Sequence, residues 1–269
     1  MSNANASIFR KLHINTLPLR LPNAWDAGSA RLIESLGAPA VATTSAGVAW
    51  ALGYRDSRGL PVEEVVALAS RMLRVVKVPL TFDIENGYAD EPAAVAALVQ
   101  RLADLGVAGI NLEDGNDAPA VAVAKLEAIR NTLARGGADV FVNMRTDVVL
   151  AGLVEPAKQV EETIRRGQSY AAAGADGFFV PGLHQESGIR AVVAGVALPL
   201  NLMAWPGLAD AANLGAWGVR RLSAGAAISQ VAWGVVEGLM RDFLESGASG
   251  QVLAGAKSYA ELQALFADR

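Results

Sequence analysis

Short apolar runs alternate along the chain with longer Ala- and Leu-rich segments in which polar residues recur at helical spacing. The repeating unit is a helical segment that ends near a glycine, followed by an apolar strand that closes on polar residues. Gly37, Gly106 and Gly174 fit the left-handed position at which helices end, and nearly continuous apolar strands are typical of parallel strands buried on both faces. The expected strands are 19–24 (LRLPNA), 40–45 (AVATTS), 79–85 (PLTFDIE), 109–114 (GINLED), 140–147 (VFVNMRTD), 177–182 (GFFVPG), 199–205 (PLNLMAW) and 219–225 (VRRLSAG).

Strands that alternate with helices in this way predict an α/β fold, a (β/α)8 TIM barrel with extended C-terminal helices. We expect an N-terminal extension over 1–20, a barrel over 21–246 that includes the last barrel helix, and a linker with a short helix over 247–269. The structural alternative is a doubly wound open sheet. It needs a glycine-rich turn after the first strand, and NAWDAGSA matches such a turn poorly.

Composition narrows the classes of function. The 269 residues are 52% hydrophobic and 19% charged, which fits one large core. The net charge of -4, without a basic run, argues against a nucleic-acid partner. No apolar stretch suits a membrane span or a signal peptide, so we expect a cytoplasmic protein with no membrane partner. The absence of cysteine excludes disulfides, thiolate metal sites and a cysteine acid or nucleophile.

In a TIM barrel the chemistry lies at the carboxyl ends of the strands. The polar residues expected there are Asp26, Thr44, Ser45, Asp83, Glu85, Glu113, Asp114, Arg145, Asp147, Asn201 and Ser223. Asp83 and Glu85 are two residues apart on a strand, so they would project from the same face, where two negative charges require a cation. A strand end that enters solvent through the turn at Asn86 and Gly87 is the plainer interpretation of these two acids.

Asp83, Glu85 and Glu113 would come from adjacent strands and could hold a divalent cation. Oxygen ligands in a chain with two histidines favour Mg2+ or Mn2+, with one acid bound directly and the others through water. Asp114 points away from Glu113 and is expected to cap the following loop. Arg145 suits an anionic substrate, and its alternative role is an ion pair with Asp147 or Glu113.

Several motifs together resemble the isocitrate lyase and phosphoenolpyruvate mutase superfamily. They are LPNAWDAGSARLIESLGAPAVATTSAGVAWALGYRD, PLTFDIENGYAD, VAGINLEDG, VNMRTD and YAAAGADGFFVPG. The resemblance implies a Mg2+-dependent enzyme (or one that uses Mn2+) acting on 2-oxo or 2-hydroxy acids through an enolate. It implies Asp83 as the direct metal ligand, Glu85 and Glu113 as ligands through water, and Arg145 as the group that stabilises the oxyanion. Glu85 stands where the family pattern has aspartate.

The resemblance also implies that Ser45, Ala46 and Gly47 bind the substrate carboxylate and that Asp56 closes the site. Thr44 and Asn201 are further candidates for substrate binding, and Arg145, Asp56 and Glu113 are the candidate catalytic residues.

Departures from the family pattern narrow the reaction. The K-K-C-G-H loop of isocitrate and methylisocitrate lyases is replaced by EDGNDAPAVAVAKLEAI, and Pro181 stands where phosphonopyruvate-handling relatives carry a histidine. His184 is expected to be a loop residue, and His13 is given no role. We expect a lyase that cleaves or decarboxylates a C–C bond of a small 2-oxo or 2-hydroxy (di)carboxylate.

The alternatives are a phosphorus–carbon bond enzyme, a 2-oxo acid binding protein that has lost catalysis, and a sugar-phosphate enzyme using the segment SAGAA. The last leaves the acids unexplained.

Near the C-terminus, Ala227, Ile228, Val231, Val235, Leu239 and Phe243 form an apolar stripe at helical spacing. Packing on the chain's own barrel is the simple interpretation. Because members of the resembled superfamily exchange their last barrel helix, the resemblance implies a homodimer or homotetramer with an exchanged C-terminal helix.

Overall fold

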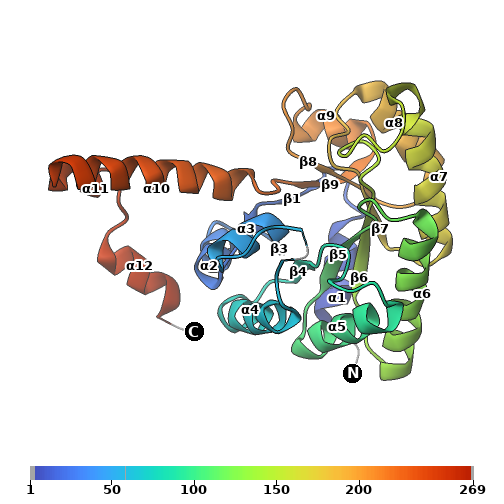
Figure 1. Cartoon of the computed structure of the whole chain (residues 1–269), viewed down its shortest axis with the longest axis horizontal. Coiled ribbons are helices and arrows are strands. Elements are labelled where there is room, and N and C mark those ends of the chain that lie inside the picture. The colour runs from blue at the N-terminus through green and yellow to red at the C-terminus, as the bar shows by residue number, and fades with distance from the viewer. Residues whose placement is uncertain (1–3, 58, 268–269) are drawn as a thin grey trace.

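The computed structural model describes residues 4–57 and 59–267, which form a parallel barrel with a projecting C-terminal arm (Figure 1). The described chain has a nine-stranded sheet in the order β1-β9-β8-β7-β6-β5-β4-β3-β2. Every paired strand is parallel to its neighbour. The strands are β1 (Leu19–Leu21), β2 (Asn23–Ala24), β3 (Val41–Thr43), β4 (Leu80–Asp83), β5 (Gly109–Glu113), β6 (Phe141–Arg145), β7 (Gly177–Phe179), β8 (Leu200–Met203) and β9 (Val219–Ser223).

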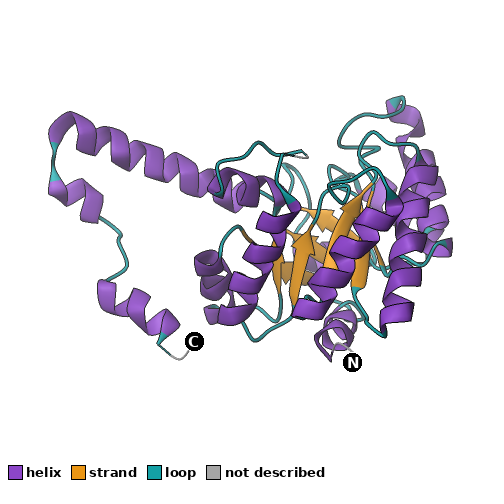
Figure 2. Cartoon of the chain, turned by 60° about the horizontal axis from the view of Figure 1, so that its bottom comes forward, coloured by secondary structure: helices purple, strands orange, loops and turns teal. Residues whose placement is uncertain are grey.

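Helices surround the strands as an outer layer (Figure 2). The helices of the described chain, including those of the end cap and of the arm, are α1 (Ala4–Leu12), α2 (Ala27–Ser35), α3 (Ser45–Ala51), α4 (Val62–Val75), α5 (Pro92–Leu105), α6 (Pro119–Gly136), η1 (Pro156–Lys158), α7 (Gln159–Ala172), α8 (Glu186–Gly195), α9 (Ala211–Ala216), α10 (Ala227–Ser246), α11 (Ser249–Leu253) and α12 (Tyr259–Phe266). Gly37, Gly106 and Gly174 have φ angles of 86°, 102° and 99°, so the predicted left-handed helix ends are confirmed.

The barrel closes where Pro22 divides its first strand. β1 pairs with β9, and β2, directly after the proline, pairs with β3. Proline has no N–H to donate, so the hydrogen-bond ladder is interrupted while the chain passes from one neighbour to the other. The strand predicted over 19–24 is therefore two short strands that fill one place in the ring. With that division, the predicted TIM barrel is confirmed.

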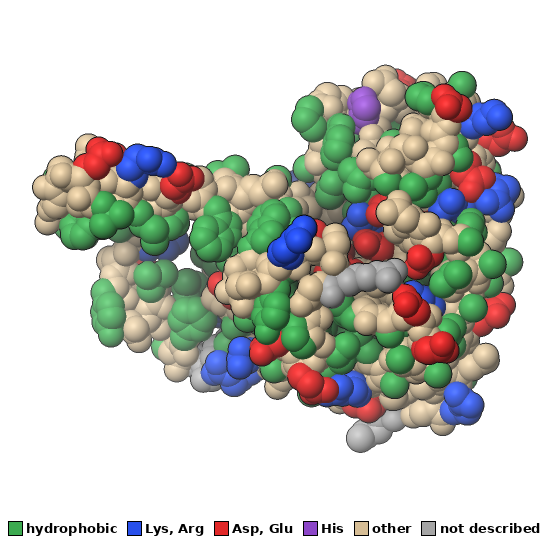
Figure 3. All heavy atoms as spheres, viewed as in Figure 1, with side chains coloured by type: hydrophobic (Ala, Val, Ile, Leu, Met, Phe, Trp, Pro, Cys, Tyr) green, Lys and Arg blue, Asp and Glu red, His purple; other side chains and the backbone are tan. Residues whose placement is uncertain are grey.

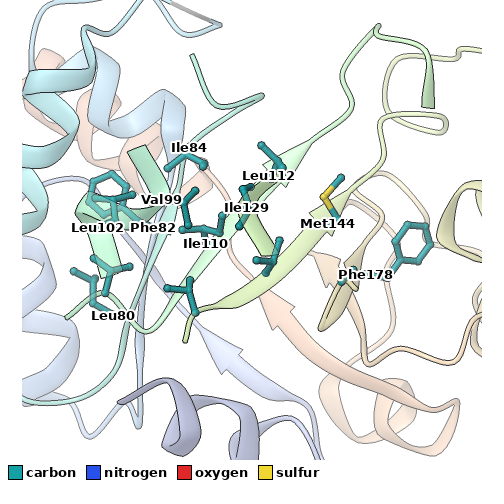
Figure 4. Close-up of a cluster of buried hydrophobic side chains, with 14 of the residues drawn as sticks. Leu80, Phe82, Ile84, Val99, Leu102, Ile110, Leu112, Ile129, Met144 and Phe178 are labelled. Atoms are coloured by element: carbon teal, nitrogen blue, oxygen red, sulfur yellow. The ribbon is translucent and has the colours of Figure 1, made fainter. Parts of the chain in front are cut away.

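The main core lies between the strands and the outer helices (Figure 4). Leu80, Phe82 and Ile84 are at most 1% exposed and pack in one cluster with Val99 and Leu102 of α5. Side chains alternate between the two faces of a strand. The same alternation therefore turns Thr81 and Asp83 toward the barrel interior.

Helix α1 closes the lower end of the barrel. Phe9 is fully buried, with its ring centroid 5.4 Å from that of Phe141, and His13 stacks on Phe141 at 4.3 Å. Gly109 makes room for this packing, since a Cβ atom there would lie 2.9 Å from Phe9 Cε1. Arg10 ties the helix to the barrel through Asp139 at 2.8 Å.

Helix α10 projects away from the barrel, and its apolar side chains lie at the surface (Figure 3). Val231 is 66% exposed, Val235 58% and Phe243 50%, so the predicted stripe does not pack on its own barrel. A groove of about 810 Å3 runs along β1 and α2, where a barrel helix following β9 would lie. The C-terminal segment returns to α2, where Arg31 Nε donates to the Leu265 carbonyl at 2.6 Å.

The three-part division of the chain stays a prediction, and residues 1–3 and 268–269 of its outer parts lie outside the described residues. Within the described ranges, no helix is both long and apolar enough to cross a membrane.

We expect His13 to make folding sensitive to acid. Burial lowers the pKa of His13 to about 3, and the charges of Arg221 and Arg10 also lower it. The contribution of neutral His13 to the unfolding free energy is therefore complete above the pKa that His13 has in the unfolded chain, about 6.5. It is lost as the pH falls below that value. Between pH 7.5 and pH 5, the wild type should lose about 2 kcal/mol more unfolding free energy than His13→Phe. Urea denaturation at both pH values measures this difference, and equal losses would contradict it.

Candidate active site

Three neighbouring strands bring the central predicted residues to the barrel mouth. β4 ends at Asp83, β5 at Glu113 and β6 at Arg145, and Glu113 is directly opposite Arg145 in the β5–β6 register. Asp83 is 7% exposed, and its backbone N–H donates to Thr43 Oγ1 at 2.8 Å. The site is thus built on rigid strand ends.

Arg145 is held between two carboxylates. Its Nη1 lies 2.7 Å from Glu113 Oε2, and its Nε and Nη2 donate to Asp147 at 2.7 and 3.0 Å. Burial alone would lower the pKa of Arg145, but Glu113, Asp147 and Asp83 together raise it above its ordinary value. Burial raises the pKa of Glu113 to about 8, against the opposing effect of Arg145. Arg145 therefore supplies a fixed positive charge inside the mouth.

Asp114 fixes the segment that carries Asp147. Its side chain is buried and accepts hydrogen bonds from the Asp147 backbone N–H at 2.9 Å and the Thr146 hydroxyl at 2.7 Å. It also accepts from Arg166 Nη1 at 2.8 Å and the Tyr170 hydroxyl at 2.6 Å, both on α7. Asp114 therefore does more than the expected capping of a loop. Partners on α7 were not predicted, because nothing in the sequence marks them as close to β5.

A polar network runs through the barrel interior beneath Asp83. Asn111 Nδ2 donates to Asp83 Oδ2 at 3.0 Å, and Asn111 Oδ1 accepts from Asn143 Nδ2 at 2.9 Å and Arg221 Nη2 at 3.2 Å. These two donors fix the Asn111 amide so that its own N–H groups face Asp83. Burial raises the pKa of Asp83, which Arg145 and the Asn111 hydrogen bond oppose. Arg221 was not among the predicted site residues.

Glu85 does not extend the strand as predicted. β4 ends at Asp83, and Glu85 has a left-handed φ of 51°, with its backbone N–H donating to Asp83 Oδ1 at 3.1 Å. Asp83 and Glu85 therefore do not project from one face of a strand, and that prediction is wrong. Glu85 nevertheless stays near the other acids. Burial raises the pKa of the nearby Tyr88 phenol, and Glu85, Asp83, Asp56 and Glu113 raise it further, so all four carboxylates act on one position.

A cavity of about 440 Å3 opens at this end of the barrel. Of the predicted site residues, those that line it are Thr44, Ser45, Ala46, Asp56, Asp83 and Arg145. Glu113 reaches the site through Arg145. Gly47 packs behind the wall, where a Cβ atom would lie 2.7 Å from Thr44 Cγ2. Asn201 is fully buried in the strand, and Met203, two residues on, lines the cavity instead.

The donor set fits a divalent cation that keeps some of its ligands as water. Asp56 Oδ1 is buried and has no hydrogen-bond partner among the described residues, and burial raises the pKa of the neighbouring Asp83 and Glu113 carboxyl groups. In the described part of the chain, no three His, Asp or Glu side chains are arranged to hold an ion together. Direct ligation by one or two carboxylates is the usual Mg2+ arrangement. Of the three predicted metal ligands, Asp83 lines the cavity.

The model of the phosphoenolpyruvate phosphomutase family matches residues 9–244. The chain belongs to this family. An uncharacterised family relative from Mycobacterium tuberculosis is 35% identical over 97% of this chain and 96% of its own length. An oxaloacetate decarboxylase from Paraburkholderia xenovorans is 32% identical over 75% of this chain and 69% of its own. The predicted isocitrate lyase and phosphoenolpyruvate mutase superfamily is confirmed.

Solved structures support the same assignment to the phosphomutase family. A Burkholderia cenocepacia protein, provisionally assigned as a phosphonomutase, shares 37% identity with a TM-score of 0.83 over 88% of this chain and 99% of its own. A 2,3-dimethylmalate lyase at 24% identity has a TM-score of 0.85 over 97% of this chain and 94% of its own, and shows the shared fold. Membership assigns the chain to a family of lyases and mutases.

We expect Asp114 to be essential for the stability of this family member. Asp114→Ala leaves the buried Arg166 with Glu162 as its remaining carboxylate partner. It also removes the acceptor of the Thr146 and Tyr170 hydroxyls and of the Asp147 N–H, so it should lower the unfolding free energy by about 3–5 kcal/mol. The control is Asp104→Ala on the exposed face of α5, where Gln100 is the partner, with an expected change within about 0.5 kcal/mol. Chemical denaturation measures both, and similar losses in the two variants would rule out this role for Asp114.

Proposed function

We propose that this protein is a Mg2+-dependent lyase that cleaves or decarboxylates a C–C bond of a small 2-oxo or 2-hydroxy carboxylate or dicarboxylate. The observation that carries the proposal is the arrangement at the barrel mouth, where the buried Asp83 and the Arg145 guanidinium line one small cavity and Glu113 pairs with Arg145. The names of the decarboxylase and lyase relatives agree with it. Mn2+ is the alternative metal.

Each residue has a role in this proposal. Asp83 holds the cation directly, and Glu85 and Glu113 bind through water. A divalent cation there supplies Lewis-acid polarisation of the substrate carbonyl. Arg145 binds the oxygen on which negative charge develops, because its charge is permanent and Glu113 and Asp147 hold its orientation.

The substrate carboxylate binds at Thr44, Ser45, Ala46 and Gly47, where β3 leads into α3 and where Ser45 adds a hydroxyl. Asp56 lies on the loop beyond α3 and closes the site. We also keep Asn201 as a candidate that acts from behind the cavity wall.

Two other functions remain open to the same test. The phosphonomutase assignment of the Burkholderia protein favours phosphorus–carbon chemistry. A binding protein without catalysis would bind the same acids and leave them unchanged. NMR of the ligand separates these outcomes, because each gives a different product or none.

Metal removal and two substitutions test the proposed roles. EDTA and Asp83→Ala should each abolish consumption of a panel of 2-oxo and 2-hydroxy acids, and Arg145→Ala should lower kcat about 100- to 1,000-fold. Matched controls are Asp104→Ala and Arg101→Ala, two exposed side chains of α5 that do not line the cavity. Unchanged turnover in Asp83→Ala or Arg145→Ala would contradict the mechanism.

We further propose that the protein forms a homodimer or homotetramer by exchanging α10. The arm offers exposed apolar side chains, and the groove along β1 and α2 matches the position that the helix leaves open. Exchange would fill the groove of each barrel with the α10 of its neighbour.

Light scattering tests the exchange. Wild type should be dimeric or tetrameric at micromolar concentration, and Val235→Lys should shift it toward monomer by placing a charge in the apolar contact. Glu245→Lys, also on α10 but on its polar side, should keep the wild-type mass. A monomeric wild type would refute the proposal.

A further inference from the structure

The cavity at the barrel mouth has two chemically different halves. Thr44, Ser45, Asp56 and Asp83 line the side formed by β3, β4 and the loop after α3. The opposite side is the apolar wall, formed by Leu150 after β6, Phe179 of β7, and Met203 and Trp205 at the end of β8. Arg145 lies on the border, with Cζ 5.8 Å from the centroid of the Phe179 ring.

Among the described residues that line the cavity, Arg145 is the one with a positive charge. Most of its hydrogen-bond donors already have carboxylate partners. Arg145 has Nη1 paired with Glu113 and both Nε and Nη2 paired with Asp147. One ligand carboxylate and a developing oxyanion together balance the positive charge that the cation and Arg145 supply. A second ligand carboxylate would meet the apolar wall, the acids or neutral polar side chains such as Ser223 and Gln230, with no cation to balance its charge, and burial of an unbalanced charge is costly.

We propose that the substrate is a 2-oxo or 2-hydroxy monocarboxylate whose side chain ends in an apolar group, and that this group binds against the apolar wall. The inference rests on the proposed function, since it uses the same cavity and narrows its substrate class. With a single carboxylate at C1, it also limits the reaction to cleavage between C3 and an oxygen-bearing C4, which leaves as a carbonyl compound, and excludes loss of CO2. The carboxylate lies on the side of Ser45, the 2-oxygen faces Asp83 and Arg145, and the side chain extends toward Leu150 and Met203. Removal of apolar surface from water stabilises this orientation.

Matched ligands separate this class from dicarboxylates. Malate and 2-hydroxy-4-methylpentanoate have the same 2-hydroxy acid end. At the other end, malate carries a carboxylate where 2-hydroxy-4-methylpentanoate carries an isopropyl group. 2-Oxoglutarate and 5-methyl-2-oxohexanoate form the corresponding 2-oxo pair. Calorimetric titration of the full chain, with Mg2+ and with EDTA, should show the alkyl member of each pair binding at least about tenfold tighter.

A substitution in the wall should reverse the preference. Leu150 is 40% exposed, so Leu150→Arg can place a guanidinium in the cavity without burying it fully. This variant should bind the dicarboxylate of each pair more tightly than the alkyl acid, whereas Leu150→Met should keep the wild-type order. An unchanged order in Leu150→Arg would overturn the placement of the side chain at the wall.

The binding results test the preference for an apolar side chain separately from the proposed lyase site. Mg2+-dependent binding of malate or 2-oxoglutarate that equals or exceeds binding of the alkyl acids would overturn the inference and leave the proposed lyase site intact. No Mg2+-dependent binding of any of the four acids would overturn both.

Discussion

Glu113, Asp147 and Asp83 all act on the guanidinium group of Arg145 at the mouth of the barrel, and this concentration of buried charge constrains the rest of the site. Glu113 and Asp147 hold Arg145 from two sides, and Asp114 holds the Asp147 segment against α7. Burial keeps the pKa of both Asp83 and Glu113 above the ordinary value. A cation that binds here relieves a cost already present in the folded chain, which links stability of the fold to chemistry at its mouth.

Polar contacts continue from the mouth into the barrel interior. Arg221 extends from β9 to Asn111 on β5. These strands lie opposite one another, because three strand positions separate them in either direction around the ring when β1 and β2 are taken as one position. Its Nε and Nη1 find no hydrogen-bond partner in the described chain, and its Cζ lies 5.7 Å from the centroid of the Phe9 ring. Burial lowers the pKa of Arg221 to about 9, against the opposing charge of Asp83. The α1 cap, the barrel interior and the metal-site candidate are thus one packed unit.

The sequence allowed prediction of what depends on local pattern. Apolar strands after glycine-terminated helices indicated the barrel, and residues at strand ends indicated Asp83, Glu113 and Arg145. Features that depend on exact backbone geometry were not predicted. Pro22 divides the first strand, and the chain leaves β4 through a left-handed conformation at Glu85. Asn201 and Met203 lie on the same face of β8, and the pattern did not show that Met203, nearer the end of the strand, lines the cavity while Asn201 is buried beneath it. Arg221 and the partners of Asp114 could not be found, because contacts across the barrel leave no mark in the spacing of residues.

The central claim is that a divalent cation at Asp83 and a small 2-oxo or 2-hydroxy acid occupy one site. Proton relaxation of 2-hydroxy-4-methylpentanoate, with Mn2+ as the paramagnetic ion, tests it most directly. Wild-type protein with Mn2+ should broaden the ligand signals, and the broadening should disappear in Asp83→Ala at the same Mn2+ concentration. Equal broadening in the two proteins would show that the acids at the strand ends do not place the cation beside the ligand.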